Sequence, residues 1–364
     1  MRVQIDSKKL IGVLKRTSKI FDDKASLPFM SRYKIEVSES SITFIAMNNQ
    51  CAVSEIISDV VADVSFSFSV EKSVFLPMAL KSEGEVLFVY DEQKKQLTIR
   101  GDGYKFVVPC VEVGYFEDLK YPAEMDVFSV RGRSMNDALK AAMENVDKDQ
   151  ESLRPVMRQI LIELYKNRII VVGSDGVTLS AYSIDAESNN EKVVQMLVSP
   201  EFYTILNPYL EEYDGIVKFG YDSSRIYAYV GNTYLYALTT EDRYLGYARI
   251  VSGYNEEKVI EVSKSNLNRA LTKIDTGSGL ADLKTENGDL SISETQLDSK
   301  AWYKIPCTAT SDIDIRINRK RMKSVIQLLE NEDIKMVYDE QRKYIAIKEE
   351  TENIKKVLII MTYA

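Results

Sequence analysis

The chain has no histidine among its 364 residues, and this absence excludes several kinds of site. Histidine is the commonest general base and the commonest nitrogen ligand for metals. Serine–histidine and cysteine–histidine nucleophile pairs are therefore excluded, as are histidine-ligated zinc sites. Carboxylate chemistry survives the exclusion. The sequence favours a protein that is not an enzyme and that uses neither a metal nor another cofactor.

Cysteine is scarce, and long apolar runs are missing. Cys51, Cys110 and Cys307 lie far apart and are odd in number, which argues against a disulfide framework or a metal site. No stretch of eighteen apolar residues predicts a membrane span, and residues 1–6 turn polar too early for a signal peptide. We therefore expect a protein of the reducing cytoplasm that has no membrane partner.

Positive charge is in deficit, because the formal net charge is −8. A simple DNA-binding protein is usually basic. An acidic total is compatible with DNA binding only where lysines and arginines gather on one face. The positions of the basic residues therefore decide whether nucleic acid is a partner.

One sequence motif occurs three times. Residues 89–99, VYDEQKKQLTI, return 248 residues later as VYDEQRKYIAI at 337–347, and a weaker copy, FGYDSSRIYAY, lies at 219–229. Each copy alternates apolar residues on both sides of an aspartate-led turn, which predicts strand, turn and strand. Half of the separation is 124 residues, a domain-sized period. The chain is therefore expected to be a triplicated domain.

The rest of each copy fits one plan. A short strand runs into a polar cap (Asp6, Ser134, and Ser263 or Ser265) and then into an amphipathic helix. Strands follow, and a second helix is expected near 71–81, 200–213 and 318–329, before further strands. This order predicts an α+β fold with mostly antiparallel sheet. The expected domains are residues 1–122, 127–251 and 254–364.

Several segments, taken in order, are similar to the bacterial beta sliding clamp, the beta subunit of DNA polymerase III. They are Leu27-Pro28 for the family's LP turn, 106–119 for F-x-L…FPNLD, GSDGVTL at 173–179 for ATDGHRL, TEDRYLGYARI at 240–250 for VDGRFPDYRRV, and LIIMTYA at 358–364 for YVVMPMRL. The resemblance spans the full length. It implies three sliding-clamp domains in each chain of a head-to-tail homodimeric ring, with sheets outside and helices lining a pore for DNA.

The sequence departs from the family pattern where the family binds its partners. Val177 and Thr178 replace a His-Arg pair, Leu245 replaces a proline, and 362–364 replace Pro-Met-Arg. These changes indicate a diverged member with an altered partner preference.

Basic residues concentrate on the helices that the resemblance places around the pore. Lys8, Lys15 and Lys19 recur at spacings of seven and four, on one helical face. By the resemblance, Lys24 corresponds to a loop residue of the family that touches DNA, and Arg154, which precedes Met157, is a second candidate. The candidate DNA-contact residues are Lys8, Lys15, Lys19, Lys24, Arg154, Arg269, Lys273, Arg319, Lys320 and Lys323. Contacts to phosphates of double-stranded DNA, independent of sequence, suit a sliding protein. The alternative is that these residues form ordinary solvated faces.

The family binds short peptide motifs of DNA polymerase and the clamp loader between its second and third domains. Carried over by position, the partner-peptide cleft comprises Met157, Ser174, Gly176, Val177, Thr178, Leu179, Leu245, Arg249, Ile250, Tyr344, Ile359, Ile360, Met361, Thr362 and Tyr363. Ile359 and Ile360 could instead serve the core of a terminal strand, and Gly176 could be a plain turn glycine. For the homodimer interface, the family positions correspond to Phe106, Val108 and Ile274.

Two other functions stay open at this point. A scaffold with the clamp fold but without DNA binding is compatible with the acidic helix that carries Glu201, Glu211 and Glu212. A carboxylate-dependent hydrolase would use Asp175 or Asp242, but no paired-carboxylate, phosphate-loop or metal-spaced motif accompanies them. The favoured reading is a replication processivity factor associated with the nucleoid.

Overall fold

The computed structural model describes residues 1–21, 27–111, 113, 116, 126–149, 151–188, 191–211 and 213–363. It divides into two compact units. Unit 1 comprises Met1–Asn136, Glu187–Asn190 and Val198–Thr240, and unit 2 comprises Asp137–Ala186, Glu191–Leu197 and Glu241–Ala364.

Nearly the same order of elements occurs three times along the chain; among the described residues, the second copy has one strand fewer between its two helices. The first copy is β1 (Arg2–Asp6), α1 (Ser7–Thr17), β2 (Arg32–Val37), β3 (Ser41–Met47), β4 (Cys51–Ser58), β5 (Val61–Ala62), β6 (Phe66–Glu71), α2 (Lys72–Ala79), β7 (Glu85–Asp91), β8 (Gln96–Gly101) and β9 (Tyr104–Val111). The second is β10 (Asp126–Arg131), α3 (Gly132–Asn145), β11 (Ile160–Tyr165), β12 (Arg168–Ser174), β13 (Thr178–Ser188), β14 (Val194–Val198), α4 (Pro200–Glu211), β15 (Ile216–Tyr221), β16 (Arg225–Val230) and β17 (Thr233–Thr240). After α5 (Ala248–Val251), the third is β18 (Lys258–Ser263), α6 (Lys264–Lys273), β19 (Leu280–Glu286), β20 (Asp289–Gln296), β21 (Ser299–Pro306), β22 (Thr308–Ala309), β23 (Asp314–Asn318), α7 (Arg319–Gln327), β24 (Asp333–Asp339), β25 (Tyr344–Glu350) and β26 (Ile354–Tyr363).

This order confirms the predicted α+β class. The expected caps are present at Asp6, which accepts from the Lys9 amide at 3.0 Å, and at Ser263, which accepts from the Asn266 amide at 3.2 Å. The expected cap Ser134 is wrong, because α3 already begins at Gly132. The domain boundaries stay a prediction, and the first of them, at 122, lies outside the described residues.

The repeated motif forms three hairpins of the same kind: β7 with β8, β15 with β16, and β24 with β25. In each, the leading aspartate turns its carboxylate back onto the amides of the turn. Asp91 accepts from the Lys94 amide at 3.0 Å and Asp339 from the Arg342 amide at 2.9 Å. Asp222 accepts from the Ser224 amide at 2.8 Å. The side chain thus satisfies amides that the strands leave unpaired.

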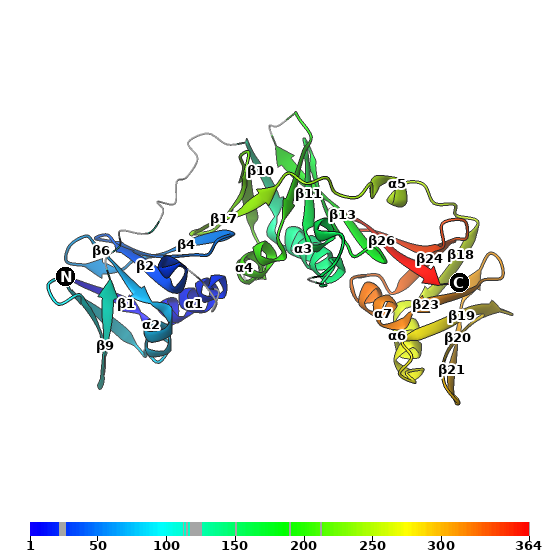
Figure 1. Cartoon of the computed structure of the whole chain (residues 1–364), viewed down its shortest axis with the longest axis horizontal. Helices are drawn as coiled ribbons and strands as arrows, with labels where there is room; N and C mark the ends of the chain where they lie inside the picture. The colour runs from blue at the N-terminus through cyan, green and yellow to red at the C-terminus, as the bar shows by residue number, and fades with distance from the viewer. Residues whose placement is uncertain are drawn as a thin grey trace. The chain divides into compact units, whose positions relative to one another are not determined.

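A continuous antiparallel sheet runs through unit 1 in the order β6-β2-β3-β4-β17-β16-β15-β10. Its join between sequence-distant segments is β4 with β17, where Val53 faces Leu235 (Figure 1). A second sheet contains β5-β1-β7-β8-β9.

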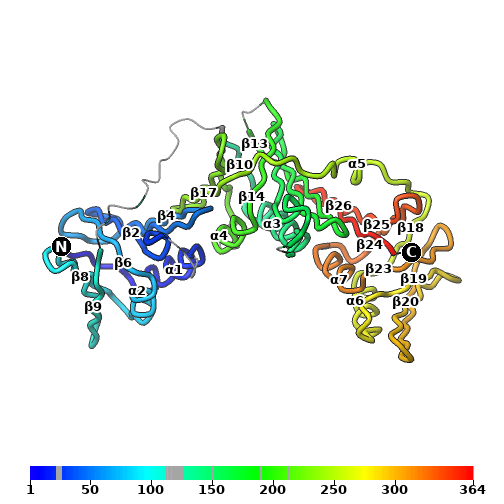
Figure 2. The backbone as a smooth tube through the Cα atoms, viewed as in Figure 1, coloured from blue at the N-terminus to red at the C-terminus, as the bar shows by residue number. Residues whose placement is uncertain are grey.

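Unit 2 repeats this arrangement. Its larger sheet has the order β11-β12-β13-β26-β25-β24-β18, in which β13 pairs with the last strand of the chain (Figure 2). Leu179 faces Ile359 across that join. The order of the smaller sheet is β21-β20-β19-β23-β26.

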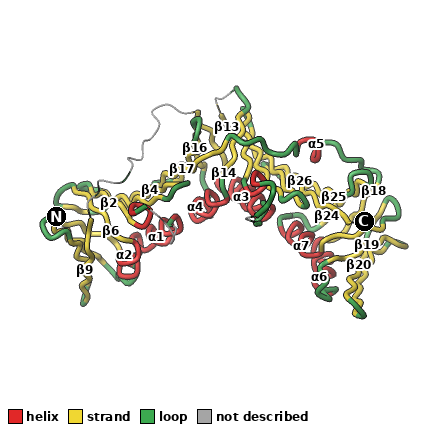
Figure 3. Tube along the Cα trace, viewed as in Figure 1, coloured by secondary structure: helices red, strands yellow, loops and turns green. Residues whose placement is uncertain are grey.

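The helices lie along one side of the strands within each unit: α1, α2 and α4 in unit 1, and α6 and α7 in unit 2 (Figure 3). α1 buries Leu10 and Leu14 completely, and α6 does the same with Leu267 and Leu271. Spacing of four residues places each pair on one face of its helix. The opposite face of each helix is therefore available to charged side chains.

Burial of tyrosine predicts instability in alkali. Burial raises the pKa of Tyr33, Tyr182 and Tyr209 above the usual value of about 10. The charge of Glu55 adds to the rise at Tyr209, and a hydrogen bond with Thr17 offsets part of it at Tyr33. A raised pKa in the folded state contributes stability that is present below about pH 10 and is lost as pH rises further.

The free energy of unfolding, measured by denaturant titration, should therefore fall as pH rises from about 10 to about 11.5. In the folded protein, tyrosinate absorbance should show that part of the 22 tyrosines titrates late. Titration of all of them together near pH 10, without loss of structure, would contradict this expectation.

Candidate DNA-facing helices and candidate partner site

Helix α1 and the turn after it present lysines to solvent. Lys8, Lys15 and Lys19 are exposed, on the side of the helix opposite the buried Leu10 and Leu14. An ammonium group on a flexible stem can follow a phosphate without a fixed geometry. These three side chains are accessible, and their contact with DNA stays a prediction. Lys24 lies outside the described residues.

Unit 2 exposes a comparable set of cations. Arg269 and Lys273 on α6 and Lys320 on α7 are exposed, whereas Lys323 is half-buried. Arg154 is exposed just before the 3-10 turn Pro155–Arg158. All five remain candidates for phosphate contact.

Arg319 is a correction. Its side chain is 4% exposed, and its Nε donates to Glu294 Oε2 at 2.6 Å, so it cannot reach a phosphate in this conformation. Burial opposes ionisation of Glu294, but the Gly279 amide and the Arg319 charge outweigh burial and lower the pKa of Glu294. The sequence held a signal for this: Arg319 stands three residues before Met322 and seven before Ile326, both buried, and thus on the core face of α7.

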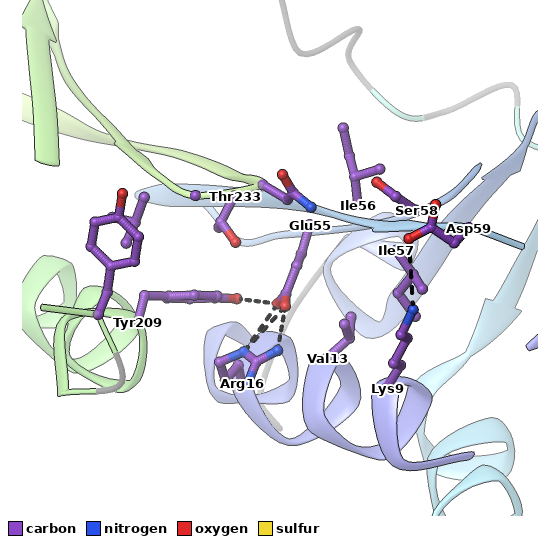
Figure 4. A pocket seen from close by; sticks show the side chains of 14 residues that line it. Lys9, Val13, Arg16, Glu55, Ile56, Ile57, Ser58, Asp59, Tyr209 and Thr233 are labelled. Carbon is purple, nitrogen blue, oxygen red and sulfur yellow. Dashed lines mark hydrogen bonds and ion pairs between the residues drawn. The ribbon is translucent and has the colours of Figure 1, made fainter. Parts of the chain in front are cut away.

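Sequence reasoning also missed the role of Arg16 on α1. Its guanidinium pairs with Glu55 of β4, with Nη2 2.5 Å from Oε1, and the Tyr209 hydroxyl of α4 donates to Glu55 Oε2 at 2.9 Å (Figure 4). Glu55 and Tyr209 are each 5% exposed. The three side chains join α1, β4 and α4, which are distant in sequence.

These groups lie at the edge of a cavity of about 460 Å³ in unit 1. Its polar wall includes Lys9 and Asp59, whose charged atoms are 4.0 Å apart and well exposed (Figure 4). Both oxygens of Glu55 are already occupied by Arg16 and Tyr209. The carboxylate therefore has a structural role in this conformation.

The candidate partner site contains the turn between β12 and β13. Gly176 has φ +85°, a left-handed conformation that favours glycine, and a Cβ there would lie 3.5 Å from Met157 Sδ. Ser174 and Thr178 are buried, while Val177 is half-buried. The Ser174 hydroxyl donates to the Thr178 carbonyl at 2.8 Å. Gly176 is thus a turn glycine, and this role does not exclude a role in partner binding.

Beside this turn, unit 2 gathers an apolar cluster from both sides of the β13–β26 join. Its buried members include Leu179, Tyr344 and Ile359. Leu245, Ile250 and Met361 are half-buried and pack against it; together with Val156, Ile170, Tyr244, Val251, Tyr254 and Val357 they form its partly exposed layer. Six of the fifteen predicted cleft residues therefore come together in this cluster: Leu179, Leu245, Ile250, Tyr344, Ile359 and Met361. Of these six, Leu245, Ile250 and Met361 keep accessible apolar surface, and a role of the set in partner binding stays a prediction.

One prediction at the chain end needs correction. Ile360 is completely buried and faces Thr178 and Ile345 in the sheet, so it is a core residue instead of a wall residue. The last strand, β26, runs to Tyr363. Thr362 pairs with Ile317 of β23. Removal of residues 361–364 would therefore damage the sheet as well as any partner site.

The segment that follows β17 is anchored by contacts that the sequence did not predict. The Tyr344 hydroxyl donates to the Ile250 carbonyl at 3.0 Å, and Arg342 donates to the Arg249 carbonyl at 3.2 Å. The Tyr247 hydroxyl donates to Glu163 of β11. Arg249 keeps an exposed side chain. The loop is thereby held against the apolar cluster.

The predicted dimer residues are unevenly accessible. Phe106 is half-buried, whereas Val108 and Ile274 are completely buried within the chain, so their side chains cannot form the interface without rearrangement. In the described part of the chain, β21 pairs only with β20 and leaves its other edge open. Trp302 lies on β21 and is 64% exposed. Dimer contact through these residues stays a prediction.

A search of the described residues gave no group of three or more acidic or sulfur side chains arranged to hold a metal ion. In the same part of the chain, no helix is long and apolar enough to span a membrane.

Comparison with solved structures identifies the fold. The DNA polymerase III subunit beta of Pseudomonas aeruginosa superposes with a TM-score of 0.89 at 15% identity, covering 100% of both chains. The beta subunit of Thermotoga maritima gives 0.87 at 17% identity, with 100% of this chain and 99% of the other covered. The sliding clamp of Bacillus subtilis gives 0.89 at 14% identity, with 100% and 99% covered.

Neither a family model nor a curated protein sequence matches the chain. The resemblance is therefore carried by structure, and it extends over the whole chain. The fold is that of the bacterial sliding clamps, as the sequence predicted, while the low identity fits the divergence seen in the quoted motifs.

Proposed function

We propose that this chain is a DNA sliding clamp, a replication processivity factor that closes as a head-to-tail homodimeric ring around duplex DNA. The full-length structural likeness to sliding clamps carries the proposal. Exposed cations on α1, α6 and α7, the helices on one side of their sheets, support it. Because DNA is the proposed ligand, we propose the cytoplasm, on the nucleoid, as the location.

The charge distribution reconciles an acidic protein with DNA. The net charge is −8, yet Lys8, Lys15, Lys19 and Lys320 all point to solvent from these helices. Point-charge contacts to phosphates are independent of base sequence, so the protein would not halt at particular sites. Base-edge hydrogen bonds would instead create positions of preferred binding.

Neutralising two lysines should weaken DNA binding by a definite amount. If Lys8 and Lys15 each contact one phosphate, replacing both by alanine should reduce the slope of log affinity against log salt by about two. The measurement is binding to short duplexes of two unrelated sequences across a salt series. Both sequences should lose affinity equally.

The matched control is Lys355→Ala, because Lys355 is well exposed on β26, on the sheet instead of a helix. Its salt slope should equal that of the parent. A slope unchanged in the double variant would remove Lys8 and Lys15 from the DNA-contact residues.

We propose further that the apolar cluster binds short peptides of a DNA polymerase and a clamp loader, with a glutamine and leucine or phenylalanine anchors. Half-buried Leu245, Ile250 and Met361 offer adaptable apolar contacts. Burial of each anchor contributes roughly 1.5–3 kcal/mol, and ordering of the peptide offsets part of it. Micromolar affinity is therefore expected.

Catalysis is not part of the proposal. Asp175 has both carboxylate oxygens engaged, by amides of its own turn and by Arg321. Asp242 is exposed, in the segment after β17. The oxygens of Asp175 are thus held by structural contacts and are not free to act as a general acid or base.

The experiment that tests the function combines solution mass with retention on DNA. The mass should be twice the chain mass of 41.5 kDa at micromolar concentration. The ring should stay on nicked circular DNA and leave it once the circle is cut. A scaffold without DNA binding would give the dimer mass and no retention, and a monomer would contradict the ring.

A further inference from the structure

We propose that Arg321 is a positioning residue for the candidate partner site. Its guanidinium holds Asp175, and through Asp175 it fixes the turn that carries Gly176, Val177 and Thr178. This inference rests on the proposed peptide-binding function of that site.

The two carboxylate oxygens of Asp175 accept hydrogen bonds from different groups. Oδ1 accepts from the Val177 amide at 2.9 Å, the Thr178 amide at 2.7 Å and the Thr178 hydroxyl at 3.1 Å. Oδ2 accepts from Arg321 Nη1, which also lies 3.4 Å from Thr178 Oγ1. One side chain therefore organises the turn, and a cation from α7 holds that side chain in place.

The backbone of Arg321 is itself held in place. It stands in the first turn of α7, where its amide donates to the cap residue Asn318 at 3.0 Å. Its side chain is 35% exposed and that of Asp175 is 15% exposed, so solvent screens the pair only in part. Hydrogen bonds between charged groups that are partly shielded are stronger than those of free surface pairs.

The turn is connected to the apolar part of the site. The Val177 carbonyl accepts from the Met361 amide at 2.9 Å, and Thr178 opens β13 opposite Ile360. A displaced turn would therefore move Val177 relative to Met361. Because Met361 and Val177 are both half-buried, their relative position shapes the surface that a peptide would meet.

A DNA contact is the competing role for Arg321, because Lys320 beside it is exposed. Both residues line a cavity of about 340 Å³ in unit 2. Its wall has four carboxylates, of Glu144, Asp147, Asp149 and Asp175, against the cations Lys148, Lys320 and Arg321. An excess of carboxylates disfavours a phosphate in this cavity. The local charge thus favours Asp175 as the lasting partner of Arg321.

The turn itself provides the first test, through amide hydrogen exchange measured on the full-length protein. Arg321→Ala should speed exchange at Val177 and Thr178 by about tenfold, because the carboxylate that accepts from them loses its anchor. Lys320→Ala is the matched control, one residue earlier on the same helix, and should leave that exchange unchanged. Equal exchange in parent and Arg321→Ala would overturn the proposal.

The second test is titration of a labelled short peptide that contains a glutamine and leucine and phenylalanine anchors. Arg321→Ala should weaken binding about tenfold, and Arg321→Lys should recover part of it because the charge remains. Asp175→Asn should weaken binding too, and the double variant should be no weaker than the worse single one. A role in general stability would give additive losses and no rescue by lysine.

The outcomes separate the two proposals. If the parent binds no such peptide, the proposed partner site fails, while the exchange experiment still decides whether Arg321 holds the turn. If the parent binds and Arg321→Ala binds equally well, only this inference fails. A salt slope for DNA that falls by about one in Arg321→Ala, with peptide affinity unchanged, would assign Arg321 to DNA instead.

Discussion

Replacing Glu55 by alanine is expected to lower the free energy of unfolding by about 3–5 kcal/mol. The variant leaves the Arg16 guanidinium without its carboxylate and the Tyr209 hydroxyl without its acceptor, and Tyr209 is 5% exposed. The loss is costly because the buried Tyr209 hydroxyl loses its acceptor and the Arg16 guanidinium, whose side chain is 22% exposed, loses its charged partner. Denaturant unfolding, followed by tyrosine fluorescence and circular dichroism, measures the change.

The matched control is Glu350→Ala. Glu350 pairs with Lys355 at 2.7 Å, close to the 2.5 Å of the Glu55 pair, but both members of this pair are well exposed. An exposed ion pair contributes less than about 1 kcal/mol. Equal losses in the two variants would mean that burial does not set the strength of the Glu55 cluster.

Replacing Leu245 by aspartate should weaken binding of the partner peptide about a hundredfold. Leu245 is half-buried against the apolar cluster and lies outside any strand or helix, so the change adds a charge to the site and spares the sheets. An apolar anchor of the peptide would lose its contact with Leu245 and would also have to displace water from the new carboxylate. Together these two effects should reduce the binding free energy by about 3 kcal/mol. Peptide titration on the full-length protein gives the change directly.

Leu297→Asp serves as the control. Leu297 is 94% exposed, at the turn between β20 and β21, and its φ of 51° is one that aspartate tolerates. Peptide affinity should equal that of the parent. Unchanged affinity in Leu245→Asp, with normal binding by the parent, would place the partner site elsewhere on the molecule.

The sequence predicted those features that depend on neighbouring residues. The aspartate-led hairpins at Asp91, Asp222 and Asp339 follow from local turn chemistry, and so do the caps at Asp6 and Ser263. These contacts can be predicted from the sequence because the side chain and its backbone partner are three residues apart or fewer. The triplicated α+β fold could be inferred from these patterns.

Side chains that act over long sequence separations were not predicted. Glu55 meets Tyr209 across 154 positions, and Arg321 meets Asp175 across 146, so no local pattern links either pair. Arg319 and Lys320 were both predicted to contact DNA, although helical phase turns Arg319 inward and leaves Lys320 outside. The charge of a residue does not indicate whether its side chain is solvated. Its position around the helix relative to the buried residues does.

The same limit explains why the burial of Ile360, Val108 and Ile274 was not predicted. Ile359 and Ile360 alternate along β26, and both are buried because the strand lies between β13 and β25 and is covered on its two faces. Val108 and Ile274 were assigned to the dimer interface from the family resemblance. Such a resemblance gives the position of a residue along the chain more reliably than the direction of its side chain. Burial of Ile360 and Val108 depends on strand pairing, and burial of Ile274 depends on how the end of α6 packs; composition encodes neither.

Retention on circular DNA tests the central claim most directly. The protein is loaded onto nicked circular duplex, either by a clamp loader or by reversible opening of the ring, and is separated from free protein by gel filtration in salt high enough to suppress simple phosphate contacts. A closed ring predicts that protein stays with the circle and is released when one restriction cut linearises the DNA, because only topology holds it. Equal retention on circular and linear DNA, or none on either, would contradict the account.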